Sequence, residues 1–400
     1  MRSLALLTLL LTACATVTAP KRDGVRVAVS FDVAGERGAS AEGIADPASG
    51  RRVTPDDPVR IASISKLVVA IGVMRLVEQG RLDLDRPVGD WLGYQVENPA
   101  FRGQKVTLRQ LLGHTSSLRD HDDQYAIPLG GSLRAVLADS ASWDPAHGPH
   151  AAYFAYANMN FPVVASVMER ATGERFDRLM QRLVILPMRL DACFNWPTCT
   201  DARVARAIEL DQDGKPVKDD LHGRRPACPV QPAADGSCEL DRWHAGDNGS
   251  LFAPQGGLRI SARDLARVGR MLLGQGTIDG ARILTPASVA AMIGPAWRYD
   301  GRNGSNDGES EGVCAYGLAI HHLASGAPGC ADDPEGKNRR WIGHSGDAYG
   351  LRSGLWIDRD RGVGVAYFTT GLPADPRRGR SAFTAAEEEA FHRAVNLIGR

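Results

Sequence analysis

The spacing of hydrophobic residues predicts that the chain begins its folded part with strands. Residues 25–31 are apolar and rich in β-branched side chains, which favours a strand that ends before Gly35 and Gly38. A second, weaker strand is expected just before Gly43.

A helix is predicted next. Residues 61–79 have the apolar spacing of a helix, and Gly80 is a natural stop signal. Ser63 therefore lies near the first turn of a largely buried helix. The apolar positions that define its period are Ile64, Leu67, Val68, Ile71, Met74 and Leu76.

The middle of the chain has a different pattern. Residues 85–188 indicate helices and turns without strand alternation, including helices over 163–171 and 176–186 separated by Gly173. Residues 211–250 are rich in Asp, Gly, Pro, His and Cys and have little periodicity. We expect a long loop or insertion there, of a kind that often serves as a functional lid.

The last third returns to strands. Residues 261–273 predict a helix with Ser261 as its N-cap. Residues 351–357 and 364–369 predict two strands around a charged hairpin turn, and residues 382–397 a closing helix.

Strands at both ends with helices between them predict one sheet built from both termini, with a helical subdomain at about residues 86–250. The hydrophobic fraction of 43% is ordinary for a globular domain, here residues 25–400. Lys+Arg and Asp+Glu both number 47, so no basic excess points to a nucleic-acid partner.

Residues 1–24 have the pattern of an export signal and tether. Arg2 and an apolar run over residues 4–11 precede Leu11-Thr12-Ala13-Cys14, which resembles the lipobox of bacterial lipoproteins. This pattern predicts cleavage before Cys14, acylation of its thiol, and membrane attachment through that lipid. A plain secretory peptide is the alternative. No later segment is apolar for long enough to span a bilayer.

Six further cysteines support an oxidising compartment such as the periplasm. Fifteen pairings are possible, and the close spacing of three couples favours sequential pairing. Unpaired thiols are the alternative, and zinc is less favoured because no Cys-x-x-Cys pair occurs. The couples are Cys193 and Cys199, Cys228 and Cys238, and Cys314 and Cys330.

Ser63-Ile64-Ser65-Lys66 is the first motif with a chemical meaning. Positions i and i+3 share a helix face, so Lys66 can reach the Ser63 hydroxyl. Serine is a poor nucleophile until a neighbouring group accepts its proton. A lysine can do so only when burial or nearby cations lower its pKa. Alone, the motif also fits an ordinary amphipathic helix.

Residues 58–66 strongly resemble the nucleophile segment of class C β-lactamases and their esterase and peptidase relatives. Tyr156-Ala157-Asn158 fits the family's Tyr-x-Asn loop, and His344-Ser345-Gly346 fits its Lys-or-His, x, Gly strand. The three elements occur in the family's order. Shorter likenesses lie at residues 111–116, 256–258 and 264–267.

The resemblance covers roughly residues 24–398 and implies a fold and a cofactor-free chemistry. The fold would be α/β (α+β), β-lactamase/transpeptidase-like: a mostly antiparallel sheet flanked by helices, with an inserted helical subdomain. Neither a metal nor an organic cofactor is implied.

The resemblance also implies residue roles. Ser63 would attack a carbonyl and form an acyl-enzyme, while Lys66 and Tyr156 would share the proton transfers. Asn158 would hydrogen-bond Lys66 or the substrate amide. The backbone N–H groups of Ser63 and Asp347 would form the oxyanion hole.

His344 is informative because β-lactamases of this type usually carry lysine there. Histidine is mostly neutral at pH 7 and holds a carboxylate more weakly. Gly346 of the same triplet would line the substrate site. The family's Pro-Gly before the tyrosine loop is represented only by the reversed Gly148-Pro149, and the 211–250 insertion is longer than usual. Both departures leave the shape of the substrate open.

Other polar residues have plainer interpretations. His114 is expected to hold a turn. His321-His322 near Asp332-Asp333 could suggest a metal, although adjacent loop histidines are usually solvated. Residues of the insertion could line the pocket or simply pack on the surface, namely Trp243, His244 and Asn248.

We therefore expect a serine hydrolase that cleaves a small ester or amide, or a peptide, through a Ser63 acyl-enzyme. A D,D-peptidase or weak β-lactamase is the alternative within enzymes. A non-catalytic, penicillin-recognising binding lipoprotein is the alternative of another class.

Overall fold

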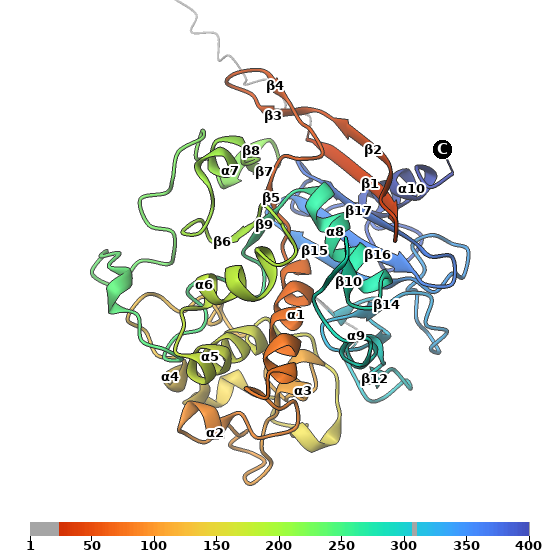
Figure 1. The fold of residues 1–400 in the computed structure, drawn as a ribbon. Coiled ribbons are helices and arrows are strands. Elements are labelled where there is room, and N and C mark those ends of the chain that lie inside the picture. Colours follow the sequence, from red (N-terminus) through yellow and green to blue (C-terminus); the bar gives the residue numbers. More distant parts are fainter. Residues whose placement is uncertain (1–23, 306–309, 400) are drawn as a thin grey trace, which may run out of the picture.

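The computed structural model describes residues 24–305 and 310–399 of the 400-residue chain. Its main feature is one antiparallel sheet of eight strands, to which both ends of the described chain contribute (Figure 1). No helix in these two ranges is long and apolar enough to cross a membrane. Across the sheet the order is β12 (Trp297–Arg298), β13 (Ala315–Tyr316), β14 (His321–His322), β15 (Ile342–Ala348), β16 (Leu351–Asp358), β17 (Val363–Thr369), β1 (Arg26–Asp32) and β2 (Glu36–Glu42).

Helices cover both faces of this sheet because its central strands are apolar on both sides. Val27, Val29 and Phe31 of β1 belong to the core that includes α8 (Ala262–Leu273). Ala28, between them, points the other way and packs in a second core with Phe391 of α10 (Ala385–Asn396). This alternation follows from the period of two along a strand.

The remaining helices lie mostly between β5 and β9 in the sequence, and most of them gather around α1, whereas α7 lies beside β7 and β8 (Figure 1). Twelve of the 15 residues of α1 are buried, because the helix is packed between the sheet and the other helices. The α-helices are α1 (Ile64–Glu78), α2 (Gly89–Leu92), α3 (Leu108–Leu112), α4 (Leu133–Ala138), α5 (Asn160–Thr172), α6 (Phe176–Met180), α7 (Asp201–Arg206) and, near the sheet, α9 (Pro286–Ile293).

Short strands complete the structure, and some of them lie inside the region expected to be helical. Three form a small sheet beside the pocket in the order β5 (Val59–Arg60), β9 (Leu258–Ile260), β6 (Cys193–Phe194). The other pairs are β3 (Ile44–Asp46) with β4 (Arg51–Arg52), β7 (Leu210–Gln212) with β8 (Lys215–Lys218), and β10 (Thr277–Ile278) with β11 (Ala281–Arg282).

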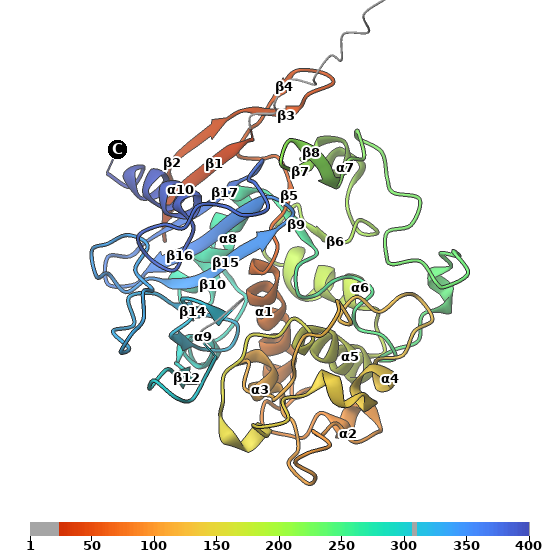
Figure 2. The ribbon, with the colours of Figure 1, turned by 180° about the vertical axis from the view of Figure 1, so that it is seen from behind.

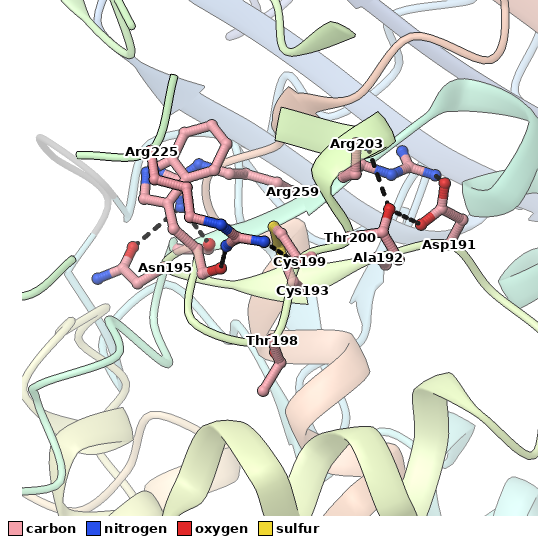
Figure 3. Close-up of a disulfide and its surroundings, with 12 residues drawn as sticks. Asp191, Ala192, Cys193, Asn195, Thr198, Cys199, Thr200, Arg203, Arg225 and Arg259 are labelled. Carbon is pink, nitrogen blue, oxygen red and sulfur yellow. Dashed lines mark hydrogen bonds and ion pairs between the residues drawn. A yellow bond between two sulfur atoms is a disulfide. The ribbon is translucent and has the colours of Figure 1, made fainter. Parts of the chain in front are cut away.

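The 211–250 insertion runs along one side of the molecule (Figure 2). It begins in the β7–β8 hairpin and contains a single 3₁₀ turn, Leu240–Arg242, and is otherwise irregular. The structure pairs the six cysteines sequentially, which confirms that prediction, and the arrangement is consistent with an exported protein. One bridge, Cys193–Cys199, closes a loop that Arg225 and Arg259 also contact (Figure 3).

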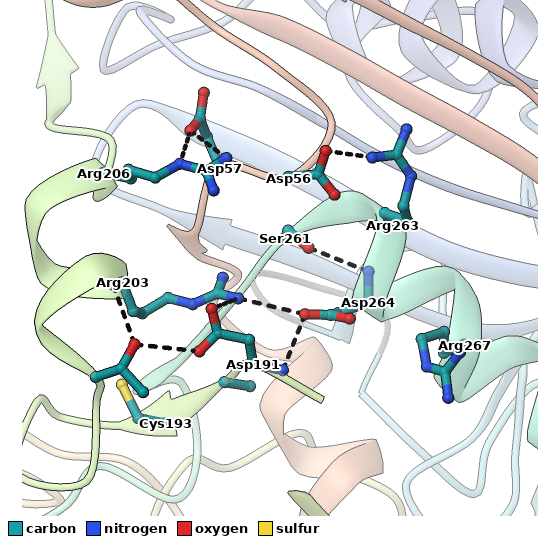
Figure 4. A network of polar contacts seen from close by, with 12 residues as sticks. Asp56, Asp57, Asp191, Cys193, Arg203, Arg206, Ser261, Arg263, Asp264 and Arg267 are labelled. Carbon is teal, nitrogen blue, oxygen red and sulfur yellow. Dashed lines mark hydrogen bonds and ion pairs between the residues drawn. The ribbon is translucent and has the colours of Figure 1, made fainter. Parts of the chain in front are cut away.

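Ion pairs fasten the region around α7 to the rest of the molecule (Figure 4). The fully buried Asp57 lies 2.9 Å from Arg206 at the end of α7. Arg203, 4% exposed, lies 2.8 Å from Asp191 and 3.3 Å from Asp264 in the first turn of α8. Because a buried charge is costly unless paired, these contacts fix α7 beside the loop before β5.

Most predicted elements exist with shifted ends. The helix predicted over 61–79 begins only at Ile64, and the one predicted over 176–186 continues from α6 into a π-helical turn, Gln181–Ile185. Ser261 is the N-cap of α8, and its hydroxyl accepts a hydrogen bond from the Asp264 N–H at 3.1 Å, which confirms that prediction.

Candidate active site

Ser63 stands at the start of α1, immediately after a backbone turn that lifts it out of the core. Ala62 before it has φ of 51°, a left-handed conformation that is uncommon for a residue with a Cβ. Ser65 holds this turn, because its Oγ donates to the Ala62 carbonyl at 2.6 Å and accepts from the Leu258 N–H at 3.1 Å. Local strain of this kind often marks a functional residue.

Strand β15 passes very close to this turn. A Cβ on Gly346 would lie 2.3 Å from the Ile61 carbonyl oxygen and 2.4 Å from Ser353 Oγ. Ser353 of β16 donates to the same carbonyl at 2.9 Å. Only glycine allows β15 to approach so closely, so Gly346 brings the predicted third motif beside the first.

Lys66 is fully buried and points at the nucleophile. Its Nζ lies 2.9 Å from Ser63 Oγ, 2.8 Å from Asn158 Oδ1 and 3.0 Å from the Gln255 carbonyl oxygen. The same Nζ is 4.8 Å from the centre of the Tyr156 ring. Residues of the first two predicted motifs therefore meet around the Lys66 Nζ atom.

The loop that carries Tyr156 and Asn158 is held by a residue that the sequence analysis missed. Asp120 accepts hydrogen bonds from the backbone N–H groups of Asn158, at 2.7 Å, and Met159, at 2.9 Å, just before α5 begins. Asp120 stands in an acidic and polar run that carries no motif, so no sequence signal distinguished it.

His114 packs against the ring of Tyr156 and holds the loop that carries it. It is buried, its Nδ1 accepts from the Ala157 N–H at 3.1 Å and from Asn160 Nδ2 at 3.0 Å, and its ring stacks on Tyr156 with centroids 4.2 Å apart. Burial lowers the pKa of His114 well below its usual value, which keeps the ring neutral. As expected, His114 holds a turn by hydrogen bonds.

His344 lies in β15 and is held as a neutral ring. Nδ1 is 2.6 Å from the Ser345 carbonyl oxygen, which can only accept, so Nδ1 carries the proton. Nε2 then accepts from the hydroxyl of the buried Tyr316 at 2.7 Å. Burial, followed by the charge of Lys66, lowers the pKa of His344 to about 3. His344 therefore offers neither a cation nor an unused donor to a substrate carboxylate.

Asp347 lies on the same strand, directly opposite Arg352 of β16. Its carboxylate pairs with Arg352, whose Nε lies 3.6 Å from Glu387 of α10. Two carboxylates thus surround the single guanidinium of Arg352, so Arg352 adds no positive excess to this part of the site.

These residues line one cavity of about 820 Å³. Ser63, Tyr156, Asn158, His344 and Asp347 all contribute to its wall. The insertion contributes as well, through residues 217–221 and 228–232.

The three insertion residues singled out from the sequence do not line this cavity. Trp243 donates to Glu169 at 3.0 Å, and Asn248 donates to the Ile127 and Pro128 carbonyl oxygens. Trp243, which is partly exposed, therefore takes the surface-packing role that was the alternative, whereas Asn248 is buried and holds the loop at residues 127–128.

The His321–His322 region serves the fold. His321 Nε2 is 3.1 Å from the Gly312 carbonyl oxygen, and Asp332 accepts from the Ser325 N–H at 2.9 Å. In residues 24–305 and 310–399 no three or more His, Cys, Asp or Glu side chains cluster as possible metal ligands.

A partly exposed serine in contact with a buried lysine at the start of a helix, beside a Tyr-x-Asn loop and a sheet strand, defines the site of a serine hydrolase. Residues 14–389 match the family model described as Beta-lactamase, and the chain belongs to that family of hydrolases, which has esterase and peptidase members.

Two curated relatives indicate the range of that family. Esterase EstB of Burkholderia gladioli is 32% identical over 38% of this chain and 42% of its own length. Penicillin-binding protein 4 of Amycolatopsis lactamdurans is 28% identical over 67% of this chain and 64% of its own length. The matches thus span less than two thirds of either relative.

The fold is also that of solved structures of the family. A class C beta lactamase from Rhodobacter sphaeroides superposes with a TM-score of 0.64 at 18% identity, covering 95% of each chain. The β-lactamase/transpeptidase-like fold implied by the sequence motifs is thereby confirmed.

Proposed function

We propose that this protein hydrolyses an ester or amide through an acyl-enzyme on Ser63. The observation that carries the proposal is the 2.9 Å contact between Ser63 Oγ and the buried Lys66 Nζ in the wall of the cavity. A serine becomes nucleophilic when a neighbouring base accepts its proton, and this lysine is within reach of that proton.

The chemistry proceeds in two halves. Lys66 or Tyr156 takes the Ser63 proton as Oγ attacks the carbonyl carbon, and the oxyanion is bound by the N–H groups of Ser63 and Asp347. The carbon–heteroatom bond then breaks, and the stored proton leaves with the alcohol or amine. Water repeats these steps on the acyl-enzyme, which releases the acid and restores Ser63.

The state of His344 favours an ester or amide over a β-lactam. Its Nε2 already accepts from Tyr316, so the position that β-lactamases fill with a cation supplies none here. The likeness to an esterase points the same way. The likeness to a penicillin-binding protein keeps a peptidase or weak β-lactamase as the second candidate.

The first test is hydrolysis of p-nitrophenyl butyrate by the full chain in detergent. Wild type should turn the ester over, and Ser63→Ala should lower kcat by at least about 10³-fold. Ser49→Ala, an exposed serine in the β3–β4 turn, is the matched control and should retain full activity. Mass spectrometry should find the acyl group on the Ser63 peptide.

Equal activity in Ser63→Ala would contradict the proposal. Stoichiometric acylation by penicillin without turnover of any ester or peptide would instead support the non-catalytic binding lipoprotein.

We further propose that Cys14, which lies outside the described residues, anchors the protein to a membrane. In a bacterial host, mass spectrometry should find the mature chain beginning at Cys14 with attached acyl groups, and Cys14→Ala should leave the membrane fraction. A wild-type chain that is processed elsewhere and carries no lipid would refute the anchor and favour a plain secretory peptide.

A further inference from the structure

Two arginines face each other beside the nucleophile. Arg60 of β5 and Arg259 of β9 are direct partners in the antiparallel register, and they are only 7% and 1% exposed. Like charges directly opposite one another destabilise a strand pair, and burial increases the cost. Such a pair requires anions nearby.

One protein carboxylate lies between them. Asp219, from the start of the insertion, is 2.7 Å from Arg259 Nη2 and 3.3 Å from Arg60 Nε. Lys218 adds a third cation, and its Nζ lies 5.6 Å from the centre of the Tyr349 ring, which Arg60 also approaches at 5.8 Å. Even with the exposed Asp220 counted, three cations face two carboxylates.

The charge of Arg259 is incompletely compensated. Its guanidinium stacks on Trp196 at 3.9 Å and donates to Asn195 at 3.0 Å, beside the Cys193–Cys199 loop (Figure 3). Its Nε is buried without a hydrogen-bond partner in the described part of the chain. Burial, followed by the charge of Arg60, lowers the pKa of Arg259 to about 9 despite the contact with Asp219.

This cluster opens into the cavity of the nucleophile. Arg60, Lys218, Arg259 and Tyr349 all line the same 820 Å³ space as Ser63. Elsewhere in the wall the carboxylates of Asp347 and Glu387 pair with Arg352, and that of Glu311 pairs with Arg378. The positive excess is therefore local to this cluster, where it attracts an anionic group of the substrate.

The cluster lies on one particular side of Ser63. Along β15, His344 stands two residues before Gly346, which adjoins the nucleophile turn, and Tyr349 follows three residues after it. The Tyr156 ring is 6.3 Å from that of His344. With Tyr156 as the one of the two proposed groups that returns the proton to the leaving group, the leaving group lies on the His344 side. The acyl portion then extends the other way, roughly 10 Å along the strand towards Tyr349.

We propose that Arg60, Lys218 and Arg259 bind a carboxylate on the acyl portion of the substrate. This inference deepens the proposed function and rests on it. The enzyme would prefer acidic acyl groups, with selectivity supplied by the insertion and the β5–β9 pair rather than by His344.

The test compares mono-p-nitrophenyl suberate, which has a free carboxylate, with its methyl ester. Wild type should show a kcat/KM about tenfold higher for the acid, since hydrogen bonds to charged groups have that strength. Arg60→Gln and the half-buried Lys218→Gln should each lower this ratio at least threefold. Arg359→Gln, an exposed arginine in the β16–β17 turn, removes a charge elsewhere and should leave the ratio unchanged.

Equal wild-type rates on the two esters, or a ratio that neither Arg60→Gln nor Lys218→Gln alters, would overturn the carboxylate site. Calorimetry on Ser63→Ala with the same two esters measures the preference without turnover. Tight binding of the acid without hydrolysis by wild type would count against the proposed function and still support the anion site. Equal binding of both esters would refute the anion site alone.

Discussion

Asp120 illustrates how a single residue outside every reactive motif can control the geometry of one. Its carboxylate accepts hydrogen bonds from the backbone N–H groups of Asn158 and Met159, and the Asn158 side chain in turn contacts Lys66. Removing the charge would loosen the Tyr156–Asn158 loop without touching Ser63. Misplacement by about 1 Å can cost on the order of 10²-fold in rate.

Asp120→Asn should therefore lower kcat on p-nitrophenyl butyrate by roughly 10- to 100-fold while KM changes little. The amide replaces an acceptor oxygen by a donor that faces a backbone N–H, which should lower the free energy of unfolding by about 1–3 kcal/mol. The exposed Asp122→Asn is the matched control. A purely structural role would reduce stability without altering kcat in the protein that remains folded.

At the scale of elements, the site depends on how closely β15 approaches the segment before α1. The Ile61 carbonyl contacts Ser353 of β16 and leaves no room for a side chain at position 346. The nucleophile turn is thus set by the sheet as well as by its own helix.

Gly346→Ala tests this packing. The added Cβ would force β15 or residues 61–62 to move, which should cost about 1–3 kcal/mol of stability and at least about 10²-fold in kcat/KM. Chemical denaturation and ester hydrolysis measure the two effects. Gly35→Ala is the control, because nothing lies within 4 Å of its Cβ position. Unchanged activity in Gly346→Ala would mean that the strand is not fixed against the nucleophile.

Some of these elements could be predicted from the sequence and others could not. Periodicity predicted α1, α5, α8 and the β16–β17 hairpin, because those segments bury one or both faces and so carry a regular apolar pattern. Strands β5, β9 and β6 were not predicted, because segments of two or three residues have no period, and β5 and β9 carry Arg60 and Arg259. The ordered motifs identified Ser63 and Lys66, whereas Asp120 and Asp219 act through contacts across 38 to 159 positions, which no local pattern encodes.

At the scale of the whole molecule, several buried histidines connect stability to pH. Burial lowers the pKa of His321 and of His344 to about 3, whereas a histidine in an unfolded chain titrates near 6.5. Between these values the unfolded state binds more protons than the native state. The stability that these neutral rings contribute is complete above about pH 6.5 and is lost as the pH falls towards 3.

Urea denaturation at pH 7.0, 6.0 and 5.0 should show this loss, with a slope approaching about 1.4 kcal/mol per pH unit for each such histidine. His344→Asn should reduce the number of protons taken up on unfolding at pH 5 by about one. The exposed His150→Asn is the control. A slope that is the same in wild type and His344→Asn would show that His344 is not kept neutral.

The strand order also decides when the molecule can fold. Strand β1 lies between β2 and β17, and the Val25 N–H donates to Thr370 Oγ1, 345 positions away. Contacts between such distant segments must overcome a large loop-closure entropy and slow the search for the native state. Until β17 has been synthesised, β1 exposes an unpaired edge that is prone to aggregation. Under the proposed export the delay would be useful, because the sheet would stay open until the last strands are made.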